Sequence, residues 1–117
     1  MTDYRVVPCT DDLLDQVAKL HHESFGLELA LSERYLDWKY KRNPYIEDAA
    51  LFVALDRAGT VVGMRGFYGT CWNVSGRPVV APCADDFAIA PEHRNVGLMT
   101  RGLQMTERAA VCAALGS

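Results

Sequence analysis

The chain has 117 residues, of which half are hydrophobic and 23% are charged, and its formal net charge is −3. This composition is typical of a soluble globular protein and excludes a disordered or fibrous one. Because nucleic acids and anionic membranes bind basic surfaces, the negative balance also disfavours both as partners.

The sequence carries no signal for a membrane or for secretion. No apolar run approaches the roughly 18 residues that a membrane-spanning helix needs, and the first residues, MTDYRVVPCTDD, contain no apolar leader segment. We therefore expect a cytoplasmic protein. The four cysteines lie far apart in the sequence, which favours free thiols over a zinc knuckle, and we expect no bound metal.

The first elements along the chain are a strand and a helix. Residues 4–7, YRVV, predict a short strand, after which Thr10 is suited to be a helix N-cap. Apolar residues then recur at spacings of three and four, which predicts a helix over residues 11–24 that ends at Gly26. His21 lies on the apolar side of this helix, where a packing histidine is the simplest interpretation.

A second helix is predicted to begin at Ser32 and to end at Asn43 and Pro44, because the residue before a proline avoids helical geometry. Its bulky members are Tyr35, Leu36, Trp38 and Tyr40. The basic run KYKR, residues 39–42, is expected to form a solvated helix face, with contact to the 3′-phosphate of coenzyme A as the alternative.

Residues 50–90 have β character. Three strand-like segments are separated by the turn sequences DRAG and NVSGR, and they are ALFVAL, TVVGMRGFYGTCW and PVVAPCADDFAIA. Two successive hairpins predict an antiparallel meander. Pro78 and Pro82 cannot donate ladder hydrogen bonds, so the early part of the last strand is expected at an edge or in an irregular segment.

After residue 97 the helical period returns, and we predict a last helix over residues 97–114. The turn before it contains Arg94 and Gly97 but no serine, threonine or aspartate at the N-cap position. The first helical amides, the helix dipole and the arginine together suit a phosphate group. The alternative is a helix start capped by Asn95 and water. The turn is neither a P-loop nor a dinucleotide-binding fingerprint.

The segment AIAPEHRNVGLM, residues 88–99, resembles the acetyl-CoA-binding segment of the GNAT family of N-acetyltransferases. Four residues match the pattern of that family, and they are Ile89, Pro91, Arg94 and Gly97. Met99 stands where the family has a small residue, and Asn95 where it often has glycine. The segment YLDWKYKRNP and the aspartate Asp86 resemble a subgroup that includes larger, two-domain acetyltransferases.

This resemblance implies a mixed α+β fold of order β-α-α-β-β-β-α, with a mainly antiparallel sheet flanked by helices. It also implies acetyl-CoA as cosubstrate and direct N-acetylation of a small amine. The backbone of three strand residues would then bind the pantetheine arm: Phe87, Ala88 and Ile89. The backbone amides of the following turn would hold the pyrophosphate: Arg94, Asn95, Val96, Gly97, Leu98 and Met99.

Asp85 and Asp86 precede the predicted cofactor segment and are the candidate catalytic residues. Strand alternation predicts that their side chains point to opposite faces, so that one of them orients or deprotonates the amine. Asp86 is the stronger candidate because it matches the subgroup, although a solvated or salt-bridged carboxylate is the alternative for either. Tyr68 and Trp72 are candidates for an acceptor pocket or for core packing.

In the GNAT fold the helix after the cofactor turn leads to a fifth strand, and this sequence stops before such a strand. We therefore expect residues 1–117 to form a single, incomplete GNAT-like domain. The fourth strand would present an unpaired edge, through which two copies would form a homo-oligomer. The alternative function is a non-catalytic module of this family that binds coenzyme A or only oligomerises.

Overall fold

The computed structural model describes residues 4–45 and 51–94. Its helical elements are a 3₁₀ turn (Asp11–Leu13), α1 (Leu14–Phe25), α2 (Leu29–Leu36), a π-helical turn (Asp37–Lys41) and a second 3₁₀ turn (Pro91–His93). Its strands are β1 (Arg5–Pro8), β2 (Leu51–Leu55), β3 (Val61–Val74) and β4 (Arg77–Ile89). The order of one strand, two helices and three strands confirms the prediction over these residues, and the predicted helix 97–114 lies outside them.

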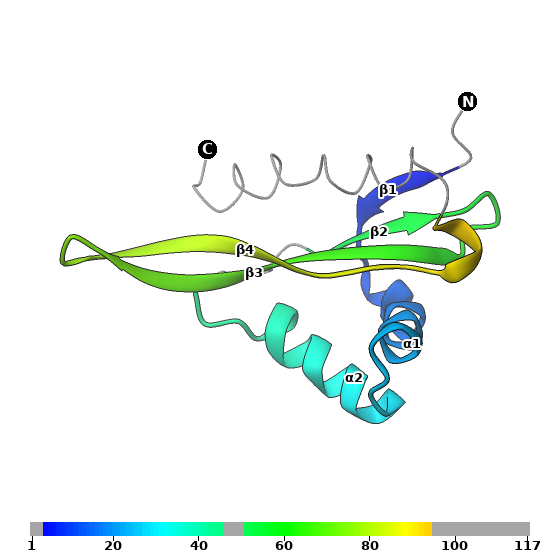
Figure 1. Ribbon diagram of the computed structural model, residues 1–117, viewed down its shortest axis with the longest axis horizontal. Coiled ribbons are helices and arrows are strands. Elements are labelled where there is room, and N and C mark those ends of the chain that lie inside the picture. The colour runs from blue at the N-terminus through cyan, green and yellow to red at the C-terminus, as the bar shows by residue number, and fades with distance from the viewer. Residues whose placement is uncertain (1–3, 46–50, 95–117) are drawn as a thin grey trace.

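The four strands form one antiparallel sheet in the order β1-β2-β3-β4. β3 and β4 make the long hairpin that dominates Figure 1 and extends well beyond the helices. Within the described residues β4 is an edge strand, as Pro78 and Pro82 predicted, because an edge tolerates residues that cannot donate a ladder hydrogen bond.

Helix α1 continues directly from the 3₁₀ turn, so the two together fill the predicted span. It ends at Gly26, whose φ of 75° is the left-handed conformation that glycine adopts without strain. Thr10 occupies the expected N-cap position, but its hydroxyl donates to the carboxylate of Asp12 and caps no backbone amide.

Helix α2 begins at Leu29, three residues before the predicted start at Ser32. Ser32 was predicted to open the helix, but it lies inside it, and its fully buried side chain bonds to His21. The helix then widens into the π-helical turn, where the amide of Arg42 donates to the carbonyl of Asp37 at 3.0 Å. Such turns are rare and frequently lie at functional sites.

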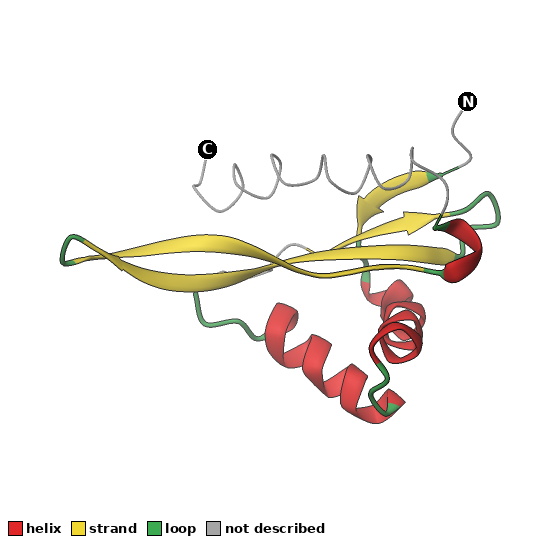
Figure 2. Ribbon diagram, viewed as in Figure 1, coloured by secondary structure: helices red, strands yellow, loops and turns green. Residues whose placement is uncertain are grey.

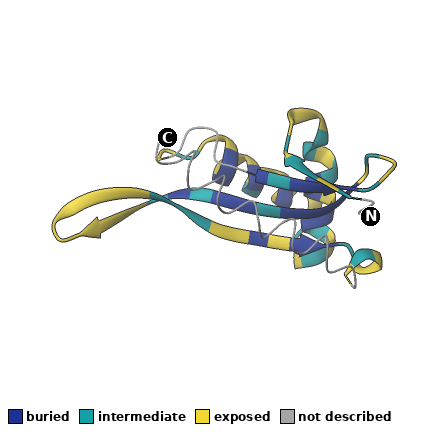
Figure 3. Cartoon of the chain, turned by 90° about the horizontal axis from the view of Figure 1, so that it is seen from above, coloured by how far each residue is buried: buried dark blue, intermediate teal, exposed yellow. Residues whose placement is uncertain are grey.

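Both helices cover the same face of the sheet (Figure 2). The main core lies between them and β2, β3 and β4, and its fully buried members include Val17, Val53 and Met64. Figure 3 shows that burial is concentrated in this half of the sheet, whereas the end of the β3–β4 hairpin is exposed. Among the described residues, no helix is long and apolar enough to cross a bilayer.

Candidate active site

The site is built on a β-bulge in β4. Met64 pairs with Ala88 and Gly66 pairs with Asp85, so Arg65 alone lies opposite the two residues Asp86 and Phe87. Asp86 has a φ of 55°, a left-handed conformation that aspartate tolerates better than most residues. Bulges of this kind redirect side chains next to functional sites.

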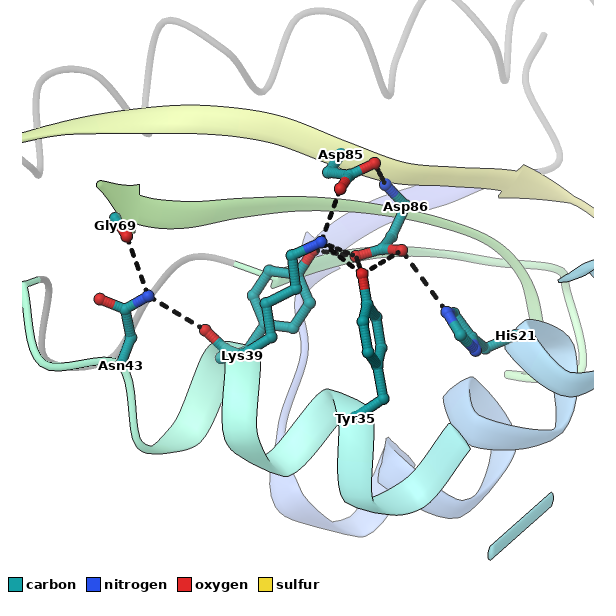
Figure 4. A network of polar contacts seen from close by, with 8 residues as sticks. His21, Tyr35, Lys39, Asn43, Gly69, Asp85 and Asp86 are labelled. Carbon is teal, nitrogen blue, oxygen red and sulfur yellow. Dashed lines mark hydrogen bonds and ion pairs between the residues drawn. The ribbon is translucent and has the colours of Figure 1, made fainter. Parts of the chain in front are cut away.

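The bulge corrects the expectation that Asp85 and Asp86 point to opposite faces. Cross-strand partners share a face, so Asp85 lies on the same side of the sheet as Gly66, which is the helix side. The extra residue turns Asp86 to this side as well. Both carboxylates therefore contact the ammonium group of Lys39, at 2.6 Å from Asp85 and 3.0 Å from Asp86 (Figure 4).

Asp86 is the centre of a buried polar network, with only 7% of its side chain exposed. Besides Lys39, the hydroxyl of Tyr40 donates to its carboxylate at 2.5 Å, and the hydroxyl of Tyr35 lies 3.3 Å from it. Nε2 of His21 lies 3.4 Å from its other oxygen. These contacts from both helices satisfy the carboxylate, so Asp86 links β4 to the helix layer.

Lys39 was expected on a solvated helix face, and this expectation is wrong for that residue. Only 6% of Lys39 is exposed, and its three N–H donors are directed to Asp85, Asp86 and the Tyr35 hydroxyl. The ammonium also lies 4.5 Å from the ring centroid of Tyr68, a cation–π contact. Lys41, by contrast, is exposed enough to pair with the surface residue Asp11.

The hydrogen bonds of this network shift the pKa values of Lys39 and Asp85 in opposite directions. Burial alone would lower the pKa of Lys39, but the hydrogen bonds to Asp85, Tyr35 and Asp86 outweigh it and raise the pKa above its ordinary value. Burial alone would raise the pKa of Asp85, and the Lys39 hydrogen bond outweighs it and lowers that pKa. Both groups are therefore ionised at neutral pH.

His21 behaves as the packing histidine that the sequence suggested. Burial lowers its pKa, which keeps the ring neutral near pH 7. Its Nδ1 lies 2.9 Å from the Ser32 hydroxyl. With a neutral ring, two carboxylates and one ammonium leave a net charge of −1 in the network.

A cavity of about 570 Å³ lies beside the network, between the end of the helix layer and β3. Its walls are mainly aromatic and apolar, with Lys39 at one side. The residues that line it are Tyr35, Trp38, Lys39, Asn43, Pro44, Tyr45, Tyr68, Gly69, Thr70 and Cys71. Tyr68 thus lines a cavity, as one reading of the sequence predicted, whereas Trp72 is not among these residues and is 56% exposed.

The predicted cofactor strand borders a second, smaller cavity. This cavity measures about 360 Å³ and is lined by Ser24, Phe25, Phe87, Ala88, Ile89 and Arg94. The guanidinium of Arg94 folds back so that Nε donates to the Ile89 carbonyl at 3.0 Å. Four of the predicted cofactor residues are therefore together, and the other five, Asn95, Val96, Gly97, Leu98 and Met99, lie outside the described residues.

A family model for the acetyltransferase (GNAT) domain matches residues 5–110. The chain belongs to the GNAT family. No protein with a curated description matches it. The match covers the bulge, both helices and the cofactor segment, and it confirms the family that the segment AIAPEHRNVGLM indicated.

Solved GNAT structures share the fold. An aminoglycoside 6′-N-acetyltransferase from Acinetobacter baumannii superposes with a TM-score of 0.66 at 15% identity, over 92% of this chain and 71% of that one. A GNAT family N-acetyltransferase from Escherichia coli in complex with CoA superposes with a TM-score of 0.67 at 17% identity, over 94% of this chain and 57% of that one. A GCN5-related N-acetyltransferase from Kribbella flavida superposes with a TM-score of 0.64 at 25% identity, over 92% of this chain and 28% of that one. This chain therefore spans less than two thirds of two of these three proteins.

Sequence reasoning missed the partners of the two aspartates. Lys39 and Tyr40 were read as part of a basic, solvated helix face, yet both are buried against Asp86. One signal was available: a lysine four residues after a tyrosine lies on the same side of a helix, and Tyr35 was already among the bulky residues of the predicted helix. His93, in the turn after β4, pairs with the hydroxyl of Tyr4 at 2.6 Å.

Proposed function

We propose that the chain is an acetyl-CoA-dependent N-acetyltransferase that acts on a small amine by direct transfer. In this reaction the amine nitrogen forms a bond to the acetyl carbon, the carbon–sulfur bond of the thioester breaks, and one amine proton ends on the coenzyme A sulfur. No covalent intermediate with a cysteine of the chain is needed. Membership of the GNAT family supports the proposal.

The observation that carries the proposal is the edge of β4 beside Arg94, which no other strand of the described residues covers. The amide of Ala90 donates to the Val62 carbonyl in β3 at 2.8 Å. Because backbone groups alternate along an antiparallel strand, the amide and carbonyl of Ile89 point away from β3. The Ile89 carbonyl accepts the bond from Arg94, and its amide is directed to the edge where the pantetheine arm would bind.

Two properties of this edge suit the cofactor. The cavity beside it is bordered by Phe25 and Phe87, which offer apolar contact to the pantetheine arm. Arg94 is held at the end of the strand by its bond to the backbone, so its remaining N–H groups are placed for an anionic phosphate. Arg94 and the Ile89 amide would therefore contact neighbouring parts of one extended ligand.

We assign different roles to the two aspartates. The half-exposed carboxylate of Asp85 is the group that would contact the acceptor amine, because 51% of its side chain is accessible. Its lowered pKa makes it a weak general base and a good partner for an ammonium group. Asp86 is a positioning residue, since buried donors occupy its carboxylate.

The test is amine-dependent release of free thiol from acetyl-CoA, with the acetylated amine identified by mass spectrometry. A panel of aromatic, aliphatic and sugar amines is incubated with the full chain, with Arg94→Ala as the matched control. The proposal expects thiol release that requires both an amine and Arg94. Light scattering on the same samples reports whether the chain forms a homo-oligomer.

Thiol release that is absent with every amine, in samples that bind acetyl-CoA, would overturn the proposal. The chain would then be a coenzyme A-binding module without turnover. Thiol release that does not depend on an amine would equally contradict it, because the reaction would then be hydrolysis.

A further inference from the structure

The larger cavity has a size and an aromatic lining that membership of the family does not itself predict. At about 570 Å³ it falls in the size range of small-molecule sites. Its walls include the rings of Tyr35, Trp38, Tyr45 and Tyr68, which come from the helix layer, the chain after it and β3. Trp38 is 63% exposed and Tyr45 is 53% exposed, so two large aromatic surfaces remain uncovered.

Two polar side chains in the walls, Asn43 and Thr70, already bond within the protein. The amide of Asn43 donates to the carbonyls of Lys39 and Gly69, and its oxygen accepts from the amide of Tyr45. The hydroxyl of Thr70 donates to the Ala81 carbonyl. Since the side chains of Asn43 and Thr70 are engaged and most of the remaining wall is aromatic or apolar, the wall composition favours an apolar or aromatic group over one rich in hydroxyl groups.

One end of the cavity is formed by Lys39, and the charges at this end favour a positively charged ligand group. The Lys39 ammonium is directed to Asp85 and Asp86, and the three groups together carry a net negative charge. Asp85 is the accessible member and pairs with Gly66, two residues from Tyr68 on the same face of β3. Asp85 is not itself a lining residue of the cavity, so a positive group would have to extend past Lys39 and Tyr68 to meet its carboxylate.

We propose that this cavity binds the aromatic ring of the acceptor and directs its amine toward Asp85, so that the substrate class is an arylalkylamine. The inference rests on the proposed N-acetyltransferase function for the identity of the ligand as the acceptor. The proposed binding mode does not depend on turnover. The ring of the ligand lies between Trp38 and Tyr68, and its ammonium group lies at Asp85.

The experiment measures binding by ligand-observed saturation-transfer NMR on the full chain, with and without coenzyme A. Phenethylamine is compared with phenethyl alcohol, which keeps the ring and lacks the cation, and with ethanolamine and glucosamine, which keep the cation and lack the ring. Phenethylamine is expected to bind about tenfold more tightly than phenethyl alcohol, because a hydrogen bond to a charged group is stronger. The two amines without a ring are expected to show no saturable binding.

Matched variants connect this binding to the cavity. Trp38→Ala should weaken phenethylamine binding about three- to tenfold through loss of a ring contact. Trp72→Ala removes an exposed tryptophan that touches the cavity walls only through its bond to the Thr70 hydroxyl, and it should change the binding much less. Asp85→Asn should remove the advantage of phenethylamine over phenethyl alcohol. Trp38 and Trp72 are both mostly exposed, so neither substitution is expected to unfold the chain.

Glucosamine binding as tight as phenethylamine would overturn the proposal, and so would phenethylamine binding that is indifferent to Trp38→Ala. Because this readout requires no acetyl transfer, it separates the two proposals. Phenethylamine binding without thioester consumption would support the cavity assignment and contradict the proposed N-acetyltransferase function. Acetylation of sugar amines alone would support the N-acetyltransferase function and contradict the cavity assignment.

Discussion

Gly66 lies against the phenol ring of Tyr40, and a Cβ atom added at Gly66 would fall 1.9 Å from the Tyr40 hydroxyl oxygen. No real Cβ contact is that short. The missing side chain lets Tyr40 reach Asp86, to which its hydroxyl donates at 2.5 Å. Gly66 in β3 and the bulge in β4 are thus complementary parts of one site.

Gly66→Ala is therefore expected to destabilise the fold by about 1–3 kcal/mol, the usual cost of forcing extra atoms into a packed core. The free energy of unfolding from urea denaturation is the measurement. Tyr40→Phe should not rescue the variant, because the ring carbon that carries the hydroxyl would still lie 2.3 Å away. Tyr40→Leu in the same background should reduce the added cost of the alanine, and an unchanged cost would contradict the packing account.

Lys39→Met is expected to be strongly destabilising, by about 3–5 kcal/mol, because it leaves the buried Asp86 carboxylate without its cation. Lys41→Met is the matched control on the same turn. Its pair with Asp11 is exposed, so its loss should cost less than about 1 kcal/mol. Adding Asp86→Asn to Lys39→Met should restore part of the stability, and equal costs for the two lysine variants would refute a buried ion pair.

His21 predicts a dependence of stability on pH. Burial lowers its pKa in the folded chain, and the facing groups Asp86 and Lys39 act in opposite directions on it. The unfolded chain therefore takes up a proton near pH 6.5 that the folded chain does not. Stability is present above that pH and declines as the pH falls from about 7 toward the folded pKa. Unfolding free energies from pH 8 to 5 should decline less in His21→Gln, and parallel curves would argue against this origin.

The lowered pKa of Asp85 predicts a second dependence of stability on pH, at more acidic pH than that of His21. Its pKa is lowered despite burial because Lys39 and the Asp86 amide hydrogen-bond to it. A depressed folded pKa contributes stability that is present above about pH 3.9 and is lost as the pH falls through the folded value. NMR titration of the Asp85 carboxyl carbon should show a higher pKa in Lys39→Met than in the wild type or in Lys39→Arg, which keeps the positive charge. A pKa that is the same in all three would show that Lys39 does not control this group.

Much of the fold was predictable from local patterns. The strands, both hairpin turns and the span of the first helix follow from period and turn residues, and the end at Gly26 follows from its conformational freedom. The start of the second helix was predicted too late, because a serine that suits an N-cap is here a buried partner of His21. Local propensity cannot anticipate such a tertiary contact.

The site was only partly predictable. Asp85 and Asp86 were selected as candidate catalytic residues, which stays a prediction, and their common face depends on a bulge that ordinary alternation does not foresee. Lys39 was read as a surface residue because lysines are rarely buried. Its burial depends on two carboxylates that lie 46 and 47 residues away in the sequence, and only the folded sheet brings them together.

The central claim is that the β4 edge and Arg94 bind acetyl-CoA, and isothermal titration calorimetry tests it most directly. The full chain should bind acetyl-CoA, Arg94→Ala should weaken binding about tenfold or more through the loss of charge-assisted hydrogen bonds to phosphate, and Arg77→Ala, an exposed arginine at the other end of β4, should bind like the wild type. Equal weakening by Arg94→Ala and Arg77→Ala, or no binding by the wild type, would contradict the account.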